Sequence, residues 1–189
     1  MHRRGLLRAA AATAVVAACG STSATATPTK SLTTAPPGLP ASKATVELAK
    51  GGSFVFTLRA DKAPKTVANF AKKSRAGDYD GTTFHRVVPG FVAQGGDPLS
   101  KTLPAGDARL GTGGGQQATE LSDLPFVTGA VGAARGGDIR VSNDAQFYVC
   151  LGDAPHLNGQ YTNFGQVTSG MDVVGAIKIG DKIKSIKID

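Results

Sequence analysis

Cysteine and tryptophan are scarce in this chain of 189 residues, which contains two cysteines and no tryptophan. One cysteine, Cys19, follows an N-terminal apolar run and is a candidate for lipid attachment. Cys150 would then stand alone, so no intramolecular disulfide could form. Because Cys150 lies within the apolar run 147–151, we interpret it as a small buried hydrophobic residue rather than a redox group.

The chain also lacks a basic cluster interleaved with aromatic residues, which is the pattern of many nucleic-acid-binding proteins. The formal net charge is +7, but Arg3, Arg4 and Arg8 lie in a segment, 1–18, that carries no acidic residue. Without these three, the 21 basic residues fall to 18, against 14 acidic ones. This mild excess predicts a solvated surface and no nucleic-acid partner.

The apolar run that begins at Leu6 is too short to span a bilayer as a permanent helix. Its basic start and its Ala- and Val-rich continuation are typical of an export signal over residues 1–18. Arg3-Arg4 also resembles a twin-arginine signal, although His2 replaces the usual Ser or Thr. Both export routes therefore remain open.

Val16-Ala17-Ala18-Cys19 resembles the lipobox of bacterial lipoproteins, in which the cysteine becomes the lipidated first residue of the mature chain. The alternative is an ordinary Ala-rich cleavage site with a chance cysteine. Residues 19–43 are mainly Ser, Thr, Ala and Pro, which predicts a flexible tether, with a glycosylated stalk as the other interpretation. We expect an exported protein held by lipid at the extracytoplasmic face of a bacterial membrane.

Residues 44–189 show the alternation and the turn signals of a mainly β domain, and they suggest a closed β-barrel capped by helices. Apolar residues alternate over 45–48 and 53–58, which predicts a hairpin. A helix is expected from Asp61 to about Ser74, with Asp61 or a neighbour as its N-cap and Pro64 in its first turn. Further predictions are strands at 126–134, 146–151, 163–167 and 183–188, loops at 136–137 and 142–144, and a second helix over 171–177.

The stretch 84–97 carries the strongest chemical signal in the chain. A turn at Pro89-Gly90 separates two apolar runs, with Arg86 at the start of the first and Gln94 at the end of the second. A lone arginine beside buried strand residues costs free energy unless it is paired or faces a cleft. The alternative is a buried hairpin with an incidental surface arginine.

This stretch closely resembles the active-site signature of the cyclophilins, the peptidyl-prolyl cis–trans isomerases. The segment 61–70 is similar to the first cyclophilin helix, and the glycine-rich stretch 111–115 resembles the family's loop beside the substrate groove. A phosphate-binding loop is the other interpretation of these glycines, but no Gly-Lys-Ser/Thr follows them. The resemblance covers about residues 44–189 and implies a closed eight-stranded antiparallel β-barrel with a helix over each open end.

The resemblance also implies a set of site residues. Arg86, Phe91 and Gln94 form the catalytic group, and Gln94 and the backbone of Arg135 hold the peptide on either side of the rotating bond. His85 is a poor acid–base candidate, because its neighbours supply no carboxylate partner. The residues implied to contact substrate are His85, Val92, Ala134, Arg135, Gln146, Tyr148, His156, Leu157 and Tyr161.

The implied chemistry requires no nucleophile, metal or cofactor. When an X–Pro amide twists, its nitrogen stops sharing its lone pair with the carbonyl and becomes basic. A donor aimed at that nitrogen binds the transition state better than either planar ground state. Arg86 suits this role, because its guanidinium is always charged. We therefore expect a monomeric isomerase that acts on proline-containing polypeptides.

Three positions depart from the family pattern. Tyr148 stands where many members have Phe, His156 where cyclosporin-sensitive members have Trp, and Tyr161 where many have His. These departures motivate a second hypothesis, a proline-peptide-binding scaffold or chaperone with little turnover, against which the intact Arg86 argues. A solute-binding lipoprotein would fit the tether but not residues 84–97.

Overall fold

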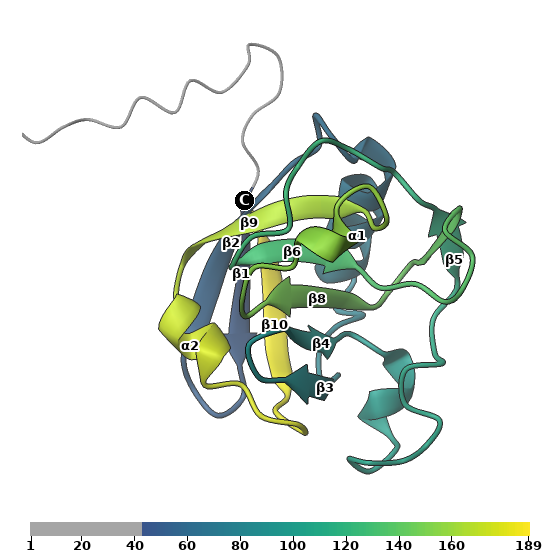
Figure 1. Cartoon of the computed structure of the whole chain (residues 1–189). Helices are drawn as coiled ribbons and strands as arrows, with labels where there is room; N and C mark the ends of the chain where they lie inside the picture. Colours follow the sequence, from purple (N-terminus) through teal and green to yellow (C-terminus); the bar gives the residue numbers. More distant parts are fainter. Residues whose placement is uncertain (1–42) are drawn as a thin grey trace, which may run out of the picture. The chain divides into compact units, whose positions relative to one another are not determined.

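Residues 43–189 are described by the computed structural model, in which β-strands predominate (Figure 1). The predicted export signal, Cys19 and the predicted tether as far as residue 42 lie outside these described residues. Lys43, expected to end the tether, is instead the first residue of a β-strand. Within residues 43–189, no helix combines the length and the apolar composition that a membrane crossing requires.

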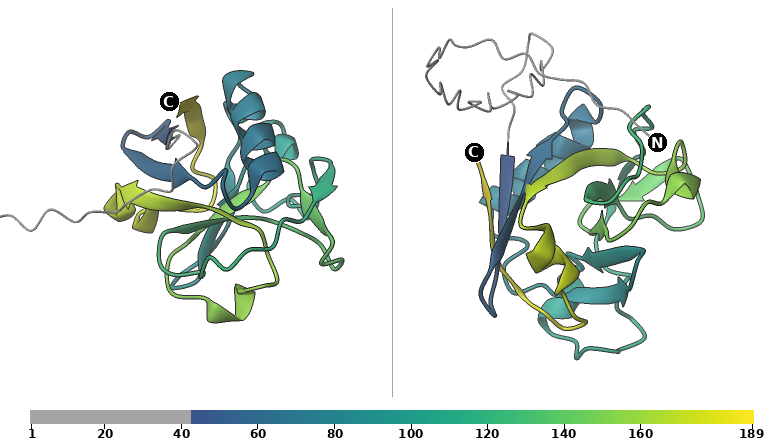
Figure 2. Two further views of the ribbon diagram at one scale, coloured as in Figure 1. Left: turned by 90° about the horizontal axis from the view of Figure 1, so that it is seen from above. Right: turned by 60° about the vertical axis from the view of Figure 1, so that its left-hand side comes forward.

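Eight strands form one antiparallel sheet that curls around the core (Figure 1). They are β1 (Lys43–Leu48), β2 (Ser53–Leu58), β3 (Phe84–Val88), β4 (Val92–Gly95), β6 (Ala130–Ala133), β8 (Phe147–Cys150), β9 (Asn163–Ser169) and β10 (Ile183–Ile188). Their order across the sheet is β10-β1-β2-β9-β6-β8-β4-β3. The helices α1 (Pro64–Arg75) and α2 (Met171–Gly175) lie at different ends of the curled sheet (Figure 2).

The sheet is an open, curled half-barrel, so the predicted closed barrel is wrong. Its edge strands, β10 and β3, are joined only by an isolated bridge between Thr83 and Lys182. The backbone hydrogen bonds beside this bridge come from the turn residues 81–84 and 180–183. Because the edges meet only where the two strands begin, β3 keeps one strand neighbour, β4, along the rest of its length.

The first hairpin is confirmed, and its burial pattern explains it. In both β1 and β2, alternate residues are buried, and Val46 of β1 pairs with Phe54 of β2 inside the core. A period of two places one apolar face of each strand against the same core. Gly51 and Gly52 have φ of 92° and 87°, which glycine adopts without strain.

The first helix is confirmed, and its N-cap is a neighbour of Asp61 rather than Asp61 itself. Ala63 occupies the N-cap position and offers no side-chain hydrogen bond, while Asp61 pairs instead with Arg59. The cap comes from Glu120, whose carboxylate accepts the backbone N–H groups of Lys65 at 3.0 Å and Thr66 at 2.7 Å. A carboxylate at a helix N-terminus satisfies free donors and complements the helix dipole. This long-range cap ties the segment before β6 to α1.

Several other predicted bounds also change. The strand expected at 126–134 spans only Ala130–Ala133, and the second helix is a short element, Met171–Gly175. Part of the loop expected at 142–144 is a strand, β7 (Val141–Asn143), which pairs with β5 (Gln116–Ala118) in a separate two-stranded sheet. The 3-10 helices η1 (Pro98–Lys101) and η2 (Pro155–Leu157) complete the described elements.

Candidate active site

Four strands place the candidate site residues in one row across the sheet. Arg86 of β3 lies opposite Gln94 of β4, which in turn lies opposite Tyr148 of β8. Tyr148 itself lies opposite Gly132 of β6. Because directly paired residues share a face of the sheet, the three side chains gather on one face. Gly132 is needed there, since the Tyr148 ring fills the space that a Cβ would occupy.

These side chains line a groove of about 240 Å³. The sequence-predicted residues in its lining are Arg86, Phe91, Val92, Gln94, Ala134, Arg135, Tyr148, Leu157 and Tyr161. Val92, Tyr148 and Leu157 are buried, so they give the groove an apolar floor. Arg86 is exposed and Gln94 is half-buried, so the polar groups stand beside that floor.

Three predicted residues lie outside the lining. Gln146 is buried behind Gln94, and His156 is an exposed residue whose ring packs on Phe91 with centroids 5.3 Å apart. His85 points its ring nitrogens into the protein, where both are buried. Gln146 and His156 therefore support groove residues from outside the cavity, and His85 is separate from it.

The Arg86 guanidinium is uncommitted. Within residues 43–189, no hydrogen bond or ion pair holds it, and its guanidinium carbon lies 5.8 Å from the centroid of the Phe91 ring. An arginine near an aromatic ring gains a modest cation–π attraction without using its N–H groups. All the donors of this side chain are thus available to a ligand in the groove.

Gln94 is oriented by a second amide. Its Nε2 donates to Oε1 of Gln146 at 3.1 Å, and Nε2 of Gln146 donates to the carbonyl oxygen of Gly113 at 2.8 Å. This arrangement does not use the carbonyl oxygen of the Gln94 amide. Because Gln94 lines the groove, that oxygen is the polar atom it offers to a bound peptide or to Arg86.

Aromatic rings brace the floor of the groove. Tyr148 stacks on Phe126 with centroids 5.9 Å apart and meets Tyr161 edge-on at 6.0 Å. The Arg135 guanidinium lies over the Tyr161 ring at 4.2 Å, and its Nε donates to the carbonyl oxygen of Gln160 at 3.0 Å. The sequence assigned a role only to the backbone of Arg135, whereas its side chain fixes one wall of the groove.

Comparison with known proteins identifies the fold that carries this groove. Residues 43–188 match the family described as cyclophilin type peptidyl-prolyl cis-trans isomerase/CLD. The chain belongs to the cyclophilin family. It is therefore a peptidyl-prolyl cis–trans isomerase, as the stretch 84–97 predicted.

Individual relatives agree with this family. A "Probable peptidyl-prolyl cis-trans isomerase" of Brucella suis is 45% identical over 141 residues, which cover 72% of this chain and 71% of that protein. Peptidyl-prolyl cis-trans isomerase B of Bacillus subtilis is 38% identical over 146 residues, with 75% and 94% covered. A Cryptosporidium parvum cyclophilin, crystallised in the presence of the dipeptide Ala-Pro, has a TM-score of 0.66 at 26% identity, with 78% of this chain and 98% of that chain covered.

Tyr148 of this cyclophilin carries a hydroxyl that no other described group satisfies. The side chain is buried, and its oxygen has no hydrogen-bond partner among residues 43–189. Burial raises the pKa of this phenol above its usual range, so it stays protonated. A buried polar group without a partner costs free energy that an apolar group of the same shape would not.

Tyr148→Phe is therefore expected to stabilise the cyclophilin. Removing the unpartnered hydroxyl should raise the free energy of unfolding by about 1 kcal/mol, measured by urea denaturation. Tyr161→Phe is the matched control, because Tyr161 lines the same groove but is only half-buried and should change little. A Tyr148→Phe variant less stable than the parent would show that the hydroxyl has a stabilising partner.

His85 does not line the groove, and its ring nitrogens lie inside the protein. Its two ring nitrogens are buried without a hydrogen-bond partner in the described part of the chain. Burial lowers the pKa of His85 below its usual value, and the Asp97 carboxylate opposes this shift only in part. The imidazole is therefore neutral at neutral pH and packs against Gly111, its Nε2 lying 3.8 Å from where a Cβ would stand.

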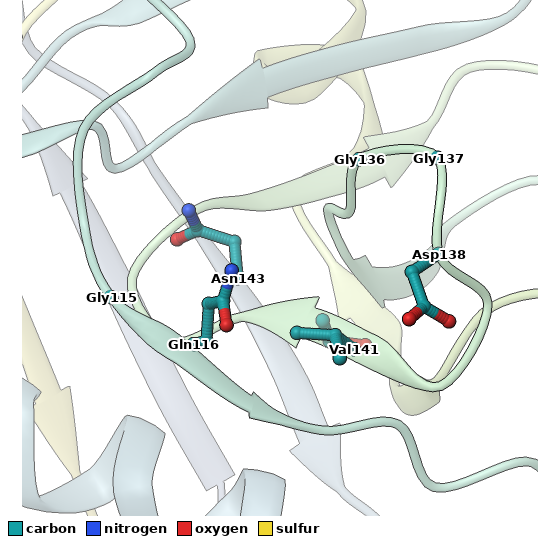
Figure 3. A pocket seen from close by; sticks show the side chains of 8 residues that line it. Gly115, Gln116, Gly136, Gly137, Asp138, Val141 and Asn143 are labelled. Atoms are coloured by element: carbon teal, nitrogen blue, oxygen red, sulfur yellow. The ribbon is translucent and has the colours of Figure 1, made fainter.

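A second cavity, which the sequence did not predict, has a volume of about 190 Å³ (Figure 3). Its walls are Gly115-Gln116 on one side and residues 136–138 and 141–143 on the other, and it shares no lining residue with the groove. At its rim, Asp138 accepts two hydrogen bonds from the Arg140 side chain, which hold the pKa of this carboxyl below its usual value.

Proposed function

We propose that this cyclophilin isomerises X–Pro bonds of exported proteins without covalent chemistry, and that Arg86 stabilises the twisted amide nitrogen. The observation that carries the proposal is the uncommitted Arg86 guanidinium beside a buried apolar floor. The floor formed by Val92, Tyr148 and Leu157 suits a proline ring, whose transfer out of water is favourable. The Ala-Pro dipeptide named with the Cryptosporidium parvum relative supports a proline-containing ligand in this groove.

The energetic requirement is modest and fits the residues present. The barrier to rotation about a peptide bond is about 18–20 kcal/mol, and each 1.36 kcal/mol removed raises the rate about tenfold. A charged donor in a partly dry groove strengthens its interaction as charge builds on the nitrogen. Gln94, held by Gln146, keeps one end of the peptide still while the other end turns. Neither step requires a proton to move.

The proposal also places the enzyme on a membrane. The segment 1–18 has the composition of an export signal, and Cys19 follows a lipobox-like sequence. Acyl chains on Cys19 would anchor a monomeric domain at the extracytoplasmic face, and the Ser-, Thr-, Ala- and Pro-rich residues 20–42 would let it reach unfolded clients.

Fractionation of bacterial cells tests the anchor. The parent is expected in the membrane fraction, released by detergent but not by salt, and Cys19→Ser should move it to the soluble exported fraction. Cys150→Ser is the control, because Cys150 is buried in β8 and should leave the distribution unchanged. A Cys19→Ser variant that remains membrane-bound would overturn the lipid anchor while leaving the isomerase mechanism intact.

A further inference from the structure

We propose that Asp97 is a positioning residue for catalysis, which sets the orientation of Gln94 through Gly113 and Gln146. The inference rests on the proposed role of Gln94 in holding the peptide. Asp97 does not line the groove, so any effect of this residue on turnover must pass through its neighbours.

The Asp97 carboxylate is buried and is satisfied by backbone donors alone. Its exposed fraction is 0%, and no ion pair in the described part of the chain includes it. Oδ1 accepts the N–H of Leu99 at 2.8 Å, and Oδ2 accepts the N–H groups of Gly111 at 2.5 Å and Gly113 at 3.3 Å. A buried charge is tolerated only with such partners, so this carboxylate fixes the groups around it.

These bonds close the long connection from β4 to β5 at its base (Figure 1). Asp97 follows the end of β4 after the single residue Gly96, whereas Gly111 and Gly113 lie beyond the excursion 98–110. No residue larger than glycine can stand at position 113, because its Cβ would overlap the Asp97 carboxylate. Asp97 thus sets where the Gly113 peptide lies relative to β4.

The Gly113 carbonyl in turn orients two amide side chains. It accepts Nε2 of Gln146 at 2.8 Å and Nδ2 of Asn143 at 3.0 Å. With its Nε2 used in this way, Gln146 presents its Oε1 to Nε2 of Gln94 at 3.1 Å. A neutral amide has one donor end and one acceptor end. The hydrogen bond to the Gly113 carbonyl fixes the orientation of the Gln146 amide, and this orientation determines which end of the Gln94 amide faces the groove.

Loss of the Asp97 hydrogen bonds should therefore disturb the orientation of the Gln94 amide more than it weakens peptide binding. The Gly113 carbonyl would shift, Gln146 would lose its fixed amide orientation, and Gln94 could present either end to the peptide. The apolar floor of Val92, Tyr148 and Leu157 comes from other elements and would remain. Small misplacements of positioning groups lower turnover far more than they lower affinity.

A double-mutant cycle on the full chain tests this relay. Asp97→Asn should lower kcat on an Ala-Pro peptide by roughly tenfold while KM stays within about twofold. Gln146→Ala should lower kcat similarly. Asp97→Asn should cause no further loss in the Gln146→Ala background, because Asp97 then has no hydrogen-bonded connection to Gln94. Asp107→Asn is the matched control, since Asp107 lies in the same excursion but its carboxylate bonds only to Arg109. Losses in kcat that multiply in the double variant would overturn the relay.

A second measurement keeps the proposal testable if Asp97→Asn does not fold. In the parent, the side-chain amide protons of Gln94 and Gln146 should exchange slowly with solvent and give distinct NMR signals, because each donates to a fixed acceptor. Rapid exchange at Gln94 would overturn the proposal. If Arg86→Ala retains full activity, the proposed mechanism itself fails; if it loses activity while the cycle is multiplicative, only the Asp97 relay fails.

Discussion

Arg86→Ala is expected to lower kcat/KM on an Ala-Pro peptide by about 100- to 1,000-fold, the usual loss when one transition-state donor is removed. The guanidinium lies beside the groove without a protein partner in the described residues, so its N–H groups have no function in holding the fold. Its contribution should appear only when the amide nitrogen becomes basic. A protease-coupled assay of the slow isomerisation phase gives this ratio.

Two further variants separate charge from geometry. Arg86→Lys keeps the positive charge but loses the planar fork of donors, and we expect activity between those of the parent and Arg86→Ala. Arg140→Ala removes a comparable exposed arginine, whose side chain bonds only to Asp138, and should leave kcat/KM unchanged. Because Arg86 is exposed, Arg86→Ala should change the free energy of unfolding by less than about 0.5 kcal/mol. Equal losses in Arg86→Ala and Arg140→Ala would point to a general electrostatic effect.

Phe70→Ala is expected to destabilise the domain by about 3–5 kcal/mol, because it empties the centre of the aromatic core. Phe70 is buried on the inner face of α1, and its ring packs against four others. The centroid distances are 5.6 Å to Phe56, 5.1 Å to Tyr79, 5.6 Å to Phe147 and 5.3 Å to Phe164. These rings belong to different elements, so the remaining side chains cannot collapse into the space without moving the sheet.

Urea denaturation measures this loss, and Phe91→Ala provides the comparison. Phe91 is half-buried at the rim of the groove, so its removal should cost clearly less stability than the removal of Phe70. The prediction for Phe70 is contradicted if both variants lose the same free energy of unfolding. Such a result would mean that the Phe70 side chain of α1 stabilises the core no more than a half-buried side chain at the rim of the groove does.

Local patterns in the sequence predicted the elements that are held by near neighbours. The β1–β2 hairpin follows from alternating apolar residues on either side of Gly51-Gly52, and β3 and β4 follow from the turn at Pro89-Gly90. Closure of the sheet was not predictable in this way. It depends on whether residues 81–84 reach 180–183, which are distant along the chain and join only at one bridge.

The same limit applies to the caps and the small sheet. Glu120 caps α1 from far along the chain, and no local pattern near Pro64 indicates it. The strands β5 and β7 contain few large apolar residues and pair only with each other, so their sequences resemble loops. Tertiary contacts decided these features, as they often do for short polar segments.

At the site, the signature indicated Arg86 and Gln94, and the strand register explains why they stand side by side. The orientation of Gln94 could not be predicted, because it depends on a buried amide and on a carbonyl of the glycine-rich loop. From the sequence, the glycine-rich stretch 111–115 was interpreted as a loop beside the groove, with a phosphate-binding loop as the alternative. The structure shows that Cβ atoms at Gly113 and Gly114 would clash with Asp97 and Asn143, and that one at Gly115 would crowd Asp144.

Exchange NMR of an Ala-Pro peptide distinguishes catalysis by Arg86 from mere peptide binding, because it measures binding and turnover in one sample. With the parent, we expect fast exchange between the cis and trans signals of the peptide at catalytic protein concentrations. With Arg86→Ala, the peptide should still bind with an affinity within a few-fold of the parent, but exchange should fall toward the uncatalysed rate. Undiminished exchange in Arg86→Ala, or binding by the parent without exchange, would contradict the account.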